Sequence, residues 1–232
     1  MKYHVSVDIE LRRNPYKGLY FALEGIDGSG KSTQAGKLKK YLESKGKNVT
    51  ATSEPRKEES PIGILIHQIL QAKVHVPLEA MQYLYTAERI ANHRDIVYPA
   101  LEAGNVVITH RCLWSNLPYG MLDRDLPDYD SNDGRVIDVA HGLLSLYHQF
   151  IVPDITFYLR IDAATAMRRL LGMGKQMEIY EKKEKLMKIA KGYEWEVVQF
   201  PEEFIIIDGE KPEDAVFEQI RSVVEKKLNG KL

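Results

Sequence analysis

The sequence lacks the features that mark several large protein classes. Its 232 residues include a single cysteine, Cys112, so no disulfide can form within the chain, as expected in a reducing cytoplasm. No apolar run approaches the roughly 18 residues of a membrane-spanning helix, and residues 1–14 contain no apolar signal core. The net charge of −1 gives no broad basic face for nucleic acid. We therefore expect a cytoplasmic protein that binds neither membrane nor nucleic acid.

The chain does contain a phosphate-binding motif at residues 25–33. The apolar run at 19–24 predicts a buried strand before the motif, and residues 33–41 predict a helix after it. A P-loop requires this placement between strand and helix, so a glycine-rich turn that matches by chance is disfavoured. The positions that fit the pattern G-x-x-x-x-G-K-[ST] are Gly25, Gly30, Lys31 and Ser32.

Each part of the motif has a chemical role in binding a triphosphate. The glycines let backbone N–H groups turn toward the phosphates, and the following helix adds its positive N-terminal end. Lys31 can reach the β- and γ-phosphates, and the hydroxyl of Ser32 can ligate Mg²⁺. The predicted ATP site within the motif comprises Gly25, Ile26, Asp27, Gly28, Ser29, Gly30, Lys31, Ser32 and Thr33.

Short apolar runs alternate with helical stretches along the rest of the chain. This alternation predicts an α/β fold, a P-loop NTPase three-layer sandwich with a five-stranded parallel sheet and helices on both faces. Residues 18–232 would form one P-loop domain, preceded by an N-terminal arm or edge strand at residues 1–17. The further strands are expected at 48–53, 105–109, 154–161 and 204–208. The helices are expected at 62–73, 78–103, 135–149, 163–171, 178–191 and 213–228.

Polar segments follow three of these strands. Ligands of parallel sheets bind at the carboxyl ends of the strands, so the P-loop, residues 53–56 and the pair at 110–111 are expected to meet in one crevice. Two glycines interrupt helical sequence at 172–176, which predicts a small lid over about residues 172–180. The acidic stretch 123–134 lacks the spacing of an EF-hand and predicts an exposed loop.

The order and spacing of further motifs resemble those of the thymidylate kinases, P-loop enzymes that transfer a phosphoryl group from ATP to dTMP. The resemblance extends from about residue 18 to residue 220. It implies ATP as donor, Mg²⁺ as cofactor, formation of dTDP for dTTP synthesis, and a homodimer. The segments that carry it are 23–34, 53–55, 61–63, 85–89, 110–119, 153–159 and 192–193.

The resemblance implies which residues bind dTMP. Tyr85 matches the aromatic side chain that stacks on thymine, and Arg89, at i+4 on the same helix face, matches the arginine that reads a thymine carbonyl. Asn116 matches a polar residue that faces N3, and Tyr119 matches the aromatic side chain near the deoxyribose. Without the resemblance, Tyr85 would be an ordinary aromatic residue on a helix face.

The resemblance also implies the charged residues of the site. Arg111 matches an arginine that holds the acceptor phosphate, a role that suits a planar, bidentate guanidinium. Asp27 matches the acid near the sugar and phosphate of the acceptor. Arg169 aligns with the residue that packs over adenine, and Glu178 with the lid glutamate.

The chemistry expected of such a site is positioning and charge neutralisation, because the attacking phosphate of dTMP is already an anion. Ser32 would hold Mg²⁺ beside the transferred group. The predicted catalytic residues are Lys31, Arg111, Asp27 and Lys175.

Several positions depart from the family pattern. His110 stands where the family has an aspartate tied to the hydration shell of Mg²⁺, and a neutral imidazole adds no negative charge there. Glu24 and Asp27 are the candidates to compensate. Many members carry a catalytic arginine in the P-loop or the lid, where this chain has Gly28 and Gln176.

The departure in the lid, and a further one at position 53, change which cations are expected at the phosphates. Lys175 is the cation nearest to the expected lid position, although lysine cannot bind bidentately. Ser53 stands where arginine is common, and Arg56 is therefore predicted to contact phosphate. Two alternatives stay open at this stage: a kinase of another pyrimidine nucleotide or nucleoside, and a nucleotide-binding protein that has lost transfer activity.

Overall fold

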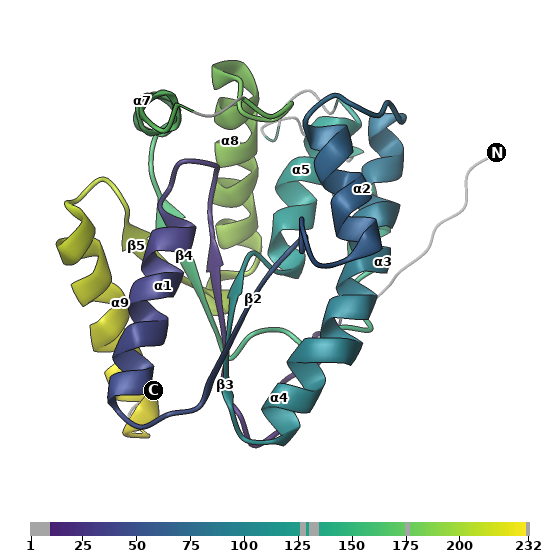
Figure 1. Cartoon of the computed structure of the whole chain (residues 1–232). Coiled ribbons are helices and arrows are strands. Elements are labelled where there is room, and N and C mark those ends of the chain that lie inside the picture. The colour runs from purple at the N-terminus through teal and green to yellow at the C-terminus, as the bar shows by residue number, and fades with distance from the viewer. Residues whose placement is uncertain (1–9, 126–128, 130–134, 175–176, 231–232) are drawn as a thin grey trace.

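The structure is a computed structural model. It describes residues 10–125, 129, 135–174 and 177–230. Five parallel strands form one sheet in the order β2-β3-β1-β4-β5 (Figure 1), so the predicted α/β sheet is confirmed. The strands are β1 (Tyr20–Glu24), β2 (Val49–Ser53), β3 (Val106–His110), β4 (Ile155–Arg160) and β5 (Phe204–Asp208).

Helices connect the strands and cover both faces of the sheet (Figure 1). They are α1 (Lys31–Ser44), α2 (Pro61–Leu70), α3 (Met81–Asn92), α4 (Tyr98–Glu102), α5 (Asn116–Asp123), α6 (Arg135–Leu144), α7 (Ala163–Gly172), α8 (Lys183–Gln199) and α9 (Glu213–Leu228). Within the described residues, no helix combines the length and the apolar character needed to cross a bilayer.

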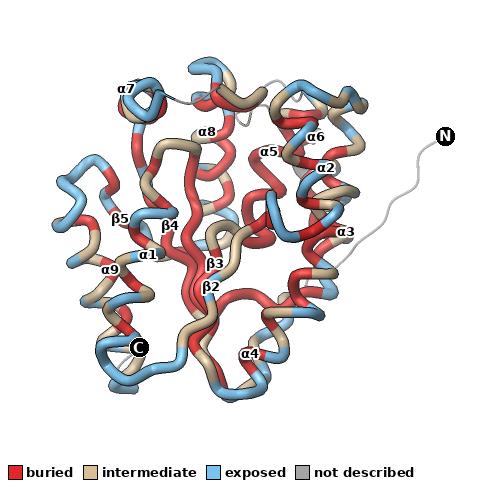
Figure 2. Tube along the Cα trace, viewed as in Figure 1, coloured by how far each residue is buried: buried red, intermediate tan, exposed pale blue. Residues whose placement is uncertain are grey.

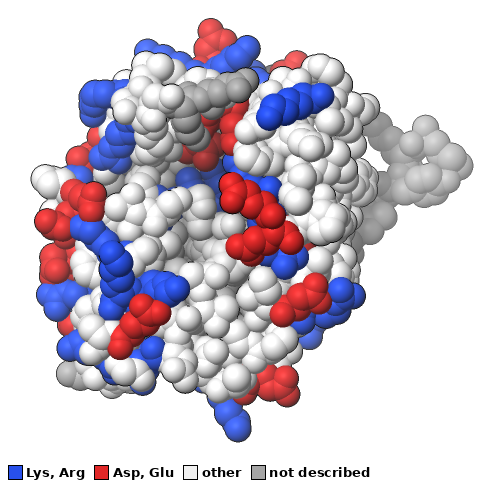
Figure 3. All heavy atoms as spheres, in the orientation of Figure 1, with Lys and Arg blue, Asp and Glu red and all other residues white. Residues whose placement is uncertain are grey.

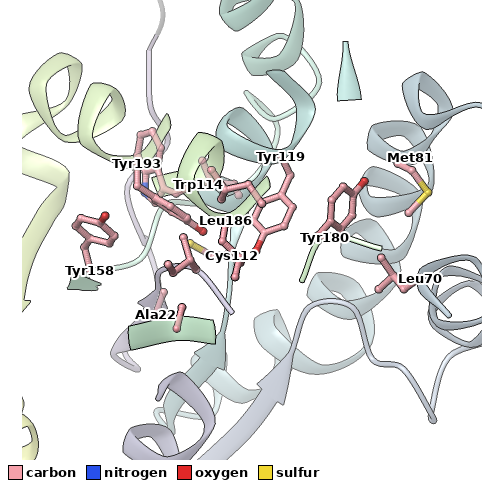
Figure 4. Close-up of a cluster of buried hydrophobic side chains, with 14 of the residues drawn as sticks. Ala22, Leu70, Met81, Cys112, Trp114, Tyr119, Tyr158, Tyr180, Leu186 and Tyr193 are labelled. Carbon is pink, nitrogen blue, oxygen red and sulfur yellow. The ribbon is translucent and has the colours of Figure 1, made fainter. Parts of the chain in front are cut away.

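Alternate side chains of the central strand pack into two separate cores, and Figure 2 shows the central strands in the red of buried residues. Phe21 and Leu23 of β1 face α1 and α9. Ala22 faces the opposite side, where Trp114 and Tyr193 belong to the larger cluster (Figure 4). Burial on both faces explains why the central strands β1, β3 and β4 read as continuous apolar runs rather than as alternating ones.

The observed helices differ from the predicted ones at several places. The helix expected at 178–191 is α8, which begins at Lys183, because the backbone N–H of Ile179 donates to the carbonyl of Leu70 at 3.0 Å instead of continuing a helix. The helix expected at 135–149 ends as α6 at Leu144 and continues as turns. Residues 116–123 were not predicted as a helix, because α5 contains Pro118 and Gly120, the two residue types with the lowest helix propensity.

The start of the described chain packs near the amino ends of β4 and β5. Arg12 forms a parallel bridge with Ile151, and Arg13 pairs with Glu203 through two hydrogen bonds of 2.8 and 2.5 Å. Residues 1–9 of the arm or edge strand expected at 1–17 lie outside the described residues, as do Lys175 and Gln176 of the expected lid. The division into an arm and a kinase domain therefore stays a prediction.

Candidate active site

A cavity of about 470 Å³ opens at the carboxyl ends of β1, β2 and β3. The P-loop, residues 53–59 and the pair His110–Arg111 all line it, so the three segments expected to converge do so. Figure 3 shows basic and acidic side chains meeting in the upper middle of this face. The other predicted residues that line the cavity are Tyr85, Arg89, Asn116, Tyr119 and Glu178.

Some predicted nucleotide-binding residues do not contribute to this cavity wall. Gly25, Ile26 and Ser29 belong to the P-loop but are buried beneath its surface. Arg169 lies beside the loop, where its guanidinium donates to the carbonyl of Gly209 at 2.9 Å and to that of Gly28 at 3.5 Å. Its role toward adenine stays a prediction.

The backbone of the P-loop depends on two glycines with positive φ. Gly30 has φ 96° and directly precedes α1, whose first residue is Lys31. Gly28 has φ 83°, and a Cβ built there would lie 2.7 Å from the carbonyl oxygen of Ala166 in α7. An arginine at position 28 is therefore incompatible with this packing, which gives the departure at this position a steric cause.

The ammonium group of Lys31 is buried beneath the loop. Its Nζ donates to the carbonyls of Gly25, at 2.9 Å, and Ile26, at 2.8 Å, and the side chain is 3% exposed. Burial, followed by the nearby charge of Arg111, lowers the pKa of Lys31 to about 7, although Asp27 opposes the shift. A phosphate oxygen could replace these carbonyls as the partner of the ammonium group.

Arg111 lies at the centre of the charged network and has the left-handed φ of 74°. Its Nη2 donates to Asp27 at 2.5 Å and to the hydroxyl of Tyr119 at 2.7 Å, and its Nη1 donates to Ser115 at 3.0 Å. Burial would raise the pKa of Asp27, but Arg111 and then Lys31 outweigh it and hold that pKa well below its usual range. Asp27 is therefore a carboxylate at any physiological pH.

Glu24 supports Arg111 from the end of β1. One carboxylate oxygen accepts from the backbone N–H groups of Cys112 and Ser115, at 2.8 and 3.1 Å. The other accepts from the hydroxyls of Ser115 and Tyr193, both at 2.7 Å. Glu24 is fully buried with both oxygens engaged, so of the two candidates Asp27 is the one that is open to the cavity beside His110.

Arg89 is buried below the cavity with one donor left over. Its Nε donates to Glu54 at 2.5 Å, and its Nη2 donates to the carbonyl of Cys112 at 3.1 Å. Its Nη1 is buried and has no hydrogen-bond partner among the described residues. Since an unpaired buried donor costs free energy, Nη1 is poised for an acceptor atom such as a base carbonyl.

Tyr85 and Asn116 also face the cavity. The ring of Tyr85 is half-buried, and burial raises its pKa far above the ordinary value, so its hydroxyl stays neutral. Asn116 is 3% exposed and its amide donates to the carbonyl of Leu113 at 2.8 Å. This bond fixes the orientation of the carboxamide.

The segment after β2 supplies a cation that the sequence did not single out. Arg56, which was expected at phosphate, lines the cavity, where its Nε donates to Glu88 at 2.7 Å and both side chains are buried. Its contact with phosphate stays a prediction. The next residue, Lys57, lines the cavity and pairs with Glu178 at 2.5 Å. The only sequence signal for Lys57 was its place beside Arg56 in the segment that departs from the family pattern.

His110 is neutral in this site. Burial, together with the charges of Lys31 and Arg111, holds the pKa of its imidazole well below the ordinary value. The described residues contain no group of three or more side chains that could hold a metal ion. Mg²⁺ binds in such sites mainly through substrate phosphates and water with one or two protein ligands, and the exposed hydroxyl of Ser32 and the carboxylate of Asp27 fit that requirement.

Comparisons with known proteins agree with this geometry. The sequence model of the thymidylate kinase family matches residues 23–220. The thymidylate kinase of Thermosipho africanus (strain TCF52B) is 32% identical over 215 residues, which cover 91% of this chain and 100% of the relative. That of Clavibacter sepedonicus is 32% identical over 210 residues, covering 88% and 93%. A probable thymidylate kinase of Staphylothermus marinus is 29% identical over 211 residues, covering 89% and 94%.

Proposed function

Because the chain belongs to the thymidylate kinase family, we propose that it transfers the γ-phosphoryl group of ATP to dTMP and so forms dTDP and ADP for dTTP synthesis. One observation carries the proposal in the structure. A single cavity joins the P-loop at Lys31 to the wall formed by Tyr85, Arg89 and Arg111. The donor triphosphate and the acceptor monophosphate would thus meet at Asp27, between the two halves.

Each residue of the cavity would have a distinct role in the phosphoryl transfer. The P-loop N–H groups and Lys31 bind the β- and γ-phosphates, and Arg111 holds the acceptor phosphate in line with them. Tyr85 stacks on the thymine, and the free Nη1 of Arg89 donates to a carbonyl of the base. Asp27 keeps Arg111 oriented through the bond of 2.5 Å.

We propose Mg²⁺ as the metal cofactor, held by Ser32 and by phosphate oxygens. Bound there, the ion would neutralise charge on the triphosphate. Asp27 is the carboxylate available to orient its water ligands, since Glu24 is enclosed and His110 is neutral.

A homodimer is also proposed, supported by apolar side chains that α2 and α3 leave exposed. Tyr83 and Ile90 on α3 are 62% and 43% exposed, and Ile64 on α2 is 41% exposed. Exposed apolar side chains gathered on neighbouring helices are typical of an interface. Light scattering should give twice the chain mass, and Ile90→Glu should give the mass of one chain.

The cytoplasmic location inferred from the single cysteine stays a prediction.

The function is tested by coupling ADP release to a panel of acceptors. With MgATP, we expect turnover of dTMP and little turnover of dUMP or thymidine. Absence of dTMP turnover would refute the proposal, and tight ATP binding in that case would favour a nucleotide-binding protein without transfer activity. His110→Asp is a useful companion, because its added negative charge should lower the Mg²⁺ concentration that gives half-maximal activity.

A further inference from the structure

A carboxylate behind the cavity wall links two elements that lie far apart in the sequence. Asp123, the last residue of α5, is 6% exposed. Its Oδ1 accepts a hydrogen bond of 2.6 Å from the hydroxyl of Tyr180, and its Oδ2 accepts one of 3.3 Å from Nε2 of Gln82. Tyr180 precedes α8, whereas Gln82 lies on α3, and both line the cavity. Asp123 therefore acts on the cavity through these two partners.

The first partner reaches the phosphate end of the acceptor site. The ring of Tyr180 meets that of Tyr119 edge to face, with centroids 5.1 Å apart and planes at 88° (Figure 4). The hydroxyl of Tyr119 accepts from Arg111 and donates to Asp27 at 3.2 Å. A shift of Tyr180 would thus change the packing of a ring that touches the two central charges of the site.

The second partner reaches the base end. Oε1 of Gln82 accepts from the hydroxyl of Tyr147 at 3.3 Å. The ring of Tyr147 lies 5.0 Å from the guanidinium carbon of Arg89, close enough for a cation–π contact. Gln82 is fully buried, and its two amide atoms are both engaged, so its position depends on both partners at once.

We propose that Asp123 is a positioning residue for the acceptor nucleotide, which fixes the wall around the base and sugar by holding Tyr180 and Gln82 together. This inference rests on the proposed function. Removal of the carboxylate would leave the hydroxyl of Tyr180 and the amide of Gln82 buried without this acceptor. Because an unpaired buried donor costs free energy, both side chains would shift toward other acceptors. The side chains that contact dTMP would then be less well ordered, whereas the backbone of the P-loop and Lys31 would be unchanged.

The protonation state of Asp123 gives this role a distinctive pH dependence. Burial raises the pKa of Asp123 to about 6, although the bonds from Tyr180 and Gln82 oppose the rise. The positive charges that face it belong to Arg124 and Lys185. The charge of Asp123 in turn contributes to the raised pKa of Tyr85. Above pH 6 both oxygens of the carboxylate can accept. Below pH 6 a proton occupies one oxygen, so the two donors lose one of their acceptors.

The test compares Asp123→Ala with Asp138→Ala, the same substitution at an exposed position on α6. We expect Asp123→Ala to raise KM for dTMP about tenfold at pH 8, the effect of orphaning a buried donor, with kcat within about twofold. Asp123→Asn keeps an acceptor for Tyr180 and should recover most of the affinity without the pH dependence. Asp138→Ala should match the wild type, and equal KM values for all variants would overturn the proposal.

Two further measurements separate positioning from a general loss of stability. Tyr180→Phe removes the same bond from the other side, so the double variant Asp123→Ala/Tyr180→Phe should be no worse than Asp123→Ala alone; additive losses would overturn the link. The ratio of KM between Asp123→Ala and the wild type should be smaller below pH 6 than at pH 8, and should approach the ratio between Asp123→Ala and Asp123→Asn, because the protonated acid, like asparagine, keeps one acceptor; a constant ratio would contradict the role of the carboxylate.

The outcome can be read separately from that of the proposed function. If the wild type does not phosphorylate dTMP, the proposed function fails, and calorimetric binding of dTMP still tests the wall. If Asp123→Ala unfolds at the assay temperature, Tyr180→Phe carries the KM measurement. A KM for that variant equal to the wild type would then overturn the inference.

Discussion

Binding of MgATP should draw a proton onto Lys31, and affinity for the nucleotide should therefore fall as pH rises from 6 to 8. In the ligand-free protein, burial and Arg111 lower the pKa of this ammonium group to about 7. A bound triphosphate places negative charge beside Nζ and favours the charged form, which returns the pKa toward its ordinary value. The charged form is the one that binds, so affinity is full below pH 7 and is lost progressively above it.

The size of the effect follows from the pKa. With a pKa of about 7, about 90% of the free protein has a neutral Lys31 at pH 8, against about 10% at pH 6. Affinity should therefore weaken about tenfold between these values, or about 1.4 kcal/mol. At pH 8 each nucleotide bound should take up about 0.9 of a proton.

Titration calorimetry at pH 8, in two buffers of different ionisation enthalpy and with excess Mg²⁺, measures this uptake directly. Lys31→Arg is the matched control, because a guanidinium stays charged throughout this range. It should show neither the uptake nor the tenfold change, and proton exchange by the nucleotide itself is common to both proteins. Equal uptake by the wild type and Lys31→Arg, or no uptake by the wild type, would refute the reasoning.

Three other predictions concern single positions. Arg111→Lys should lower kcat by on the order of a hundredfold in the dTMP assay, because lysine cannot bind phosphate and Asp27 bidentately; a kcat near the wild type would contradict its role. Lys57→Met should lower kcat about tenfold or more if this cation leaves Glu178 for the transferred phosphate, whereas an unchanged kcat would limit it to a structural contact. Gly28→Ala should reduce the free energy of unfolding in urea by about 1–2 kcal/mol or more, while Gly36→Ala, at an open helical position, should raise it by up to about 1 kcal/mol; the reverse order would be inconsistent with the P-loop geometry.

Much of the architecture could be predicted from local patterns. The three central strands, β1, β3 and β4, are buried on both faces and therefore stand out as apolar runs. Each of the five strands was found within one residue of its observed start and end. The edges of helices were less predictable, because tertiary contacts decide them. The bond between Ile179 and Leu70 delays the start of α8, and the burial of Pro118 and Gly120 stabilises α5 despite their low helix propensity.

The residues of the site also differ in whether local sequence or tertiary contacts reveal them. Lys31, Arg111 and Tyr85 could be located by motif, since their neighbours in the sequence carry the signal. Lys57 and Asp123 could not, because their importance depends on partners that are 121 and 57 residues away. The enclosure of Glu24 could not be predicted for the same reason, since only the fold shows that its four hydrogen bonds come from Cys112, Ser115 and Tyr193.

The contact between Gly28 and the backbone of Ala166 restricts how this chain could evolve. A single substitution that introduced a cation at position 28 would meet a carbonyl oxygen at 2.7 Å before it reached any phosphate. Such a gain would require α7 to move first, so the two changes would have to arise in that order. Selection for faster turnover would instead find its first improvements across the cavity, in residues 57–59, whose side chains are at least partly exposed at its edge.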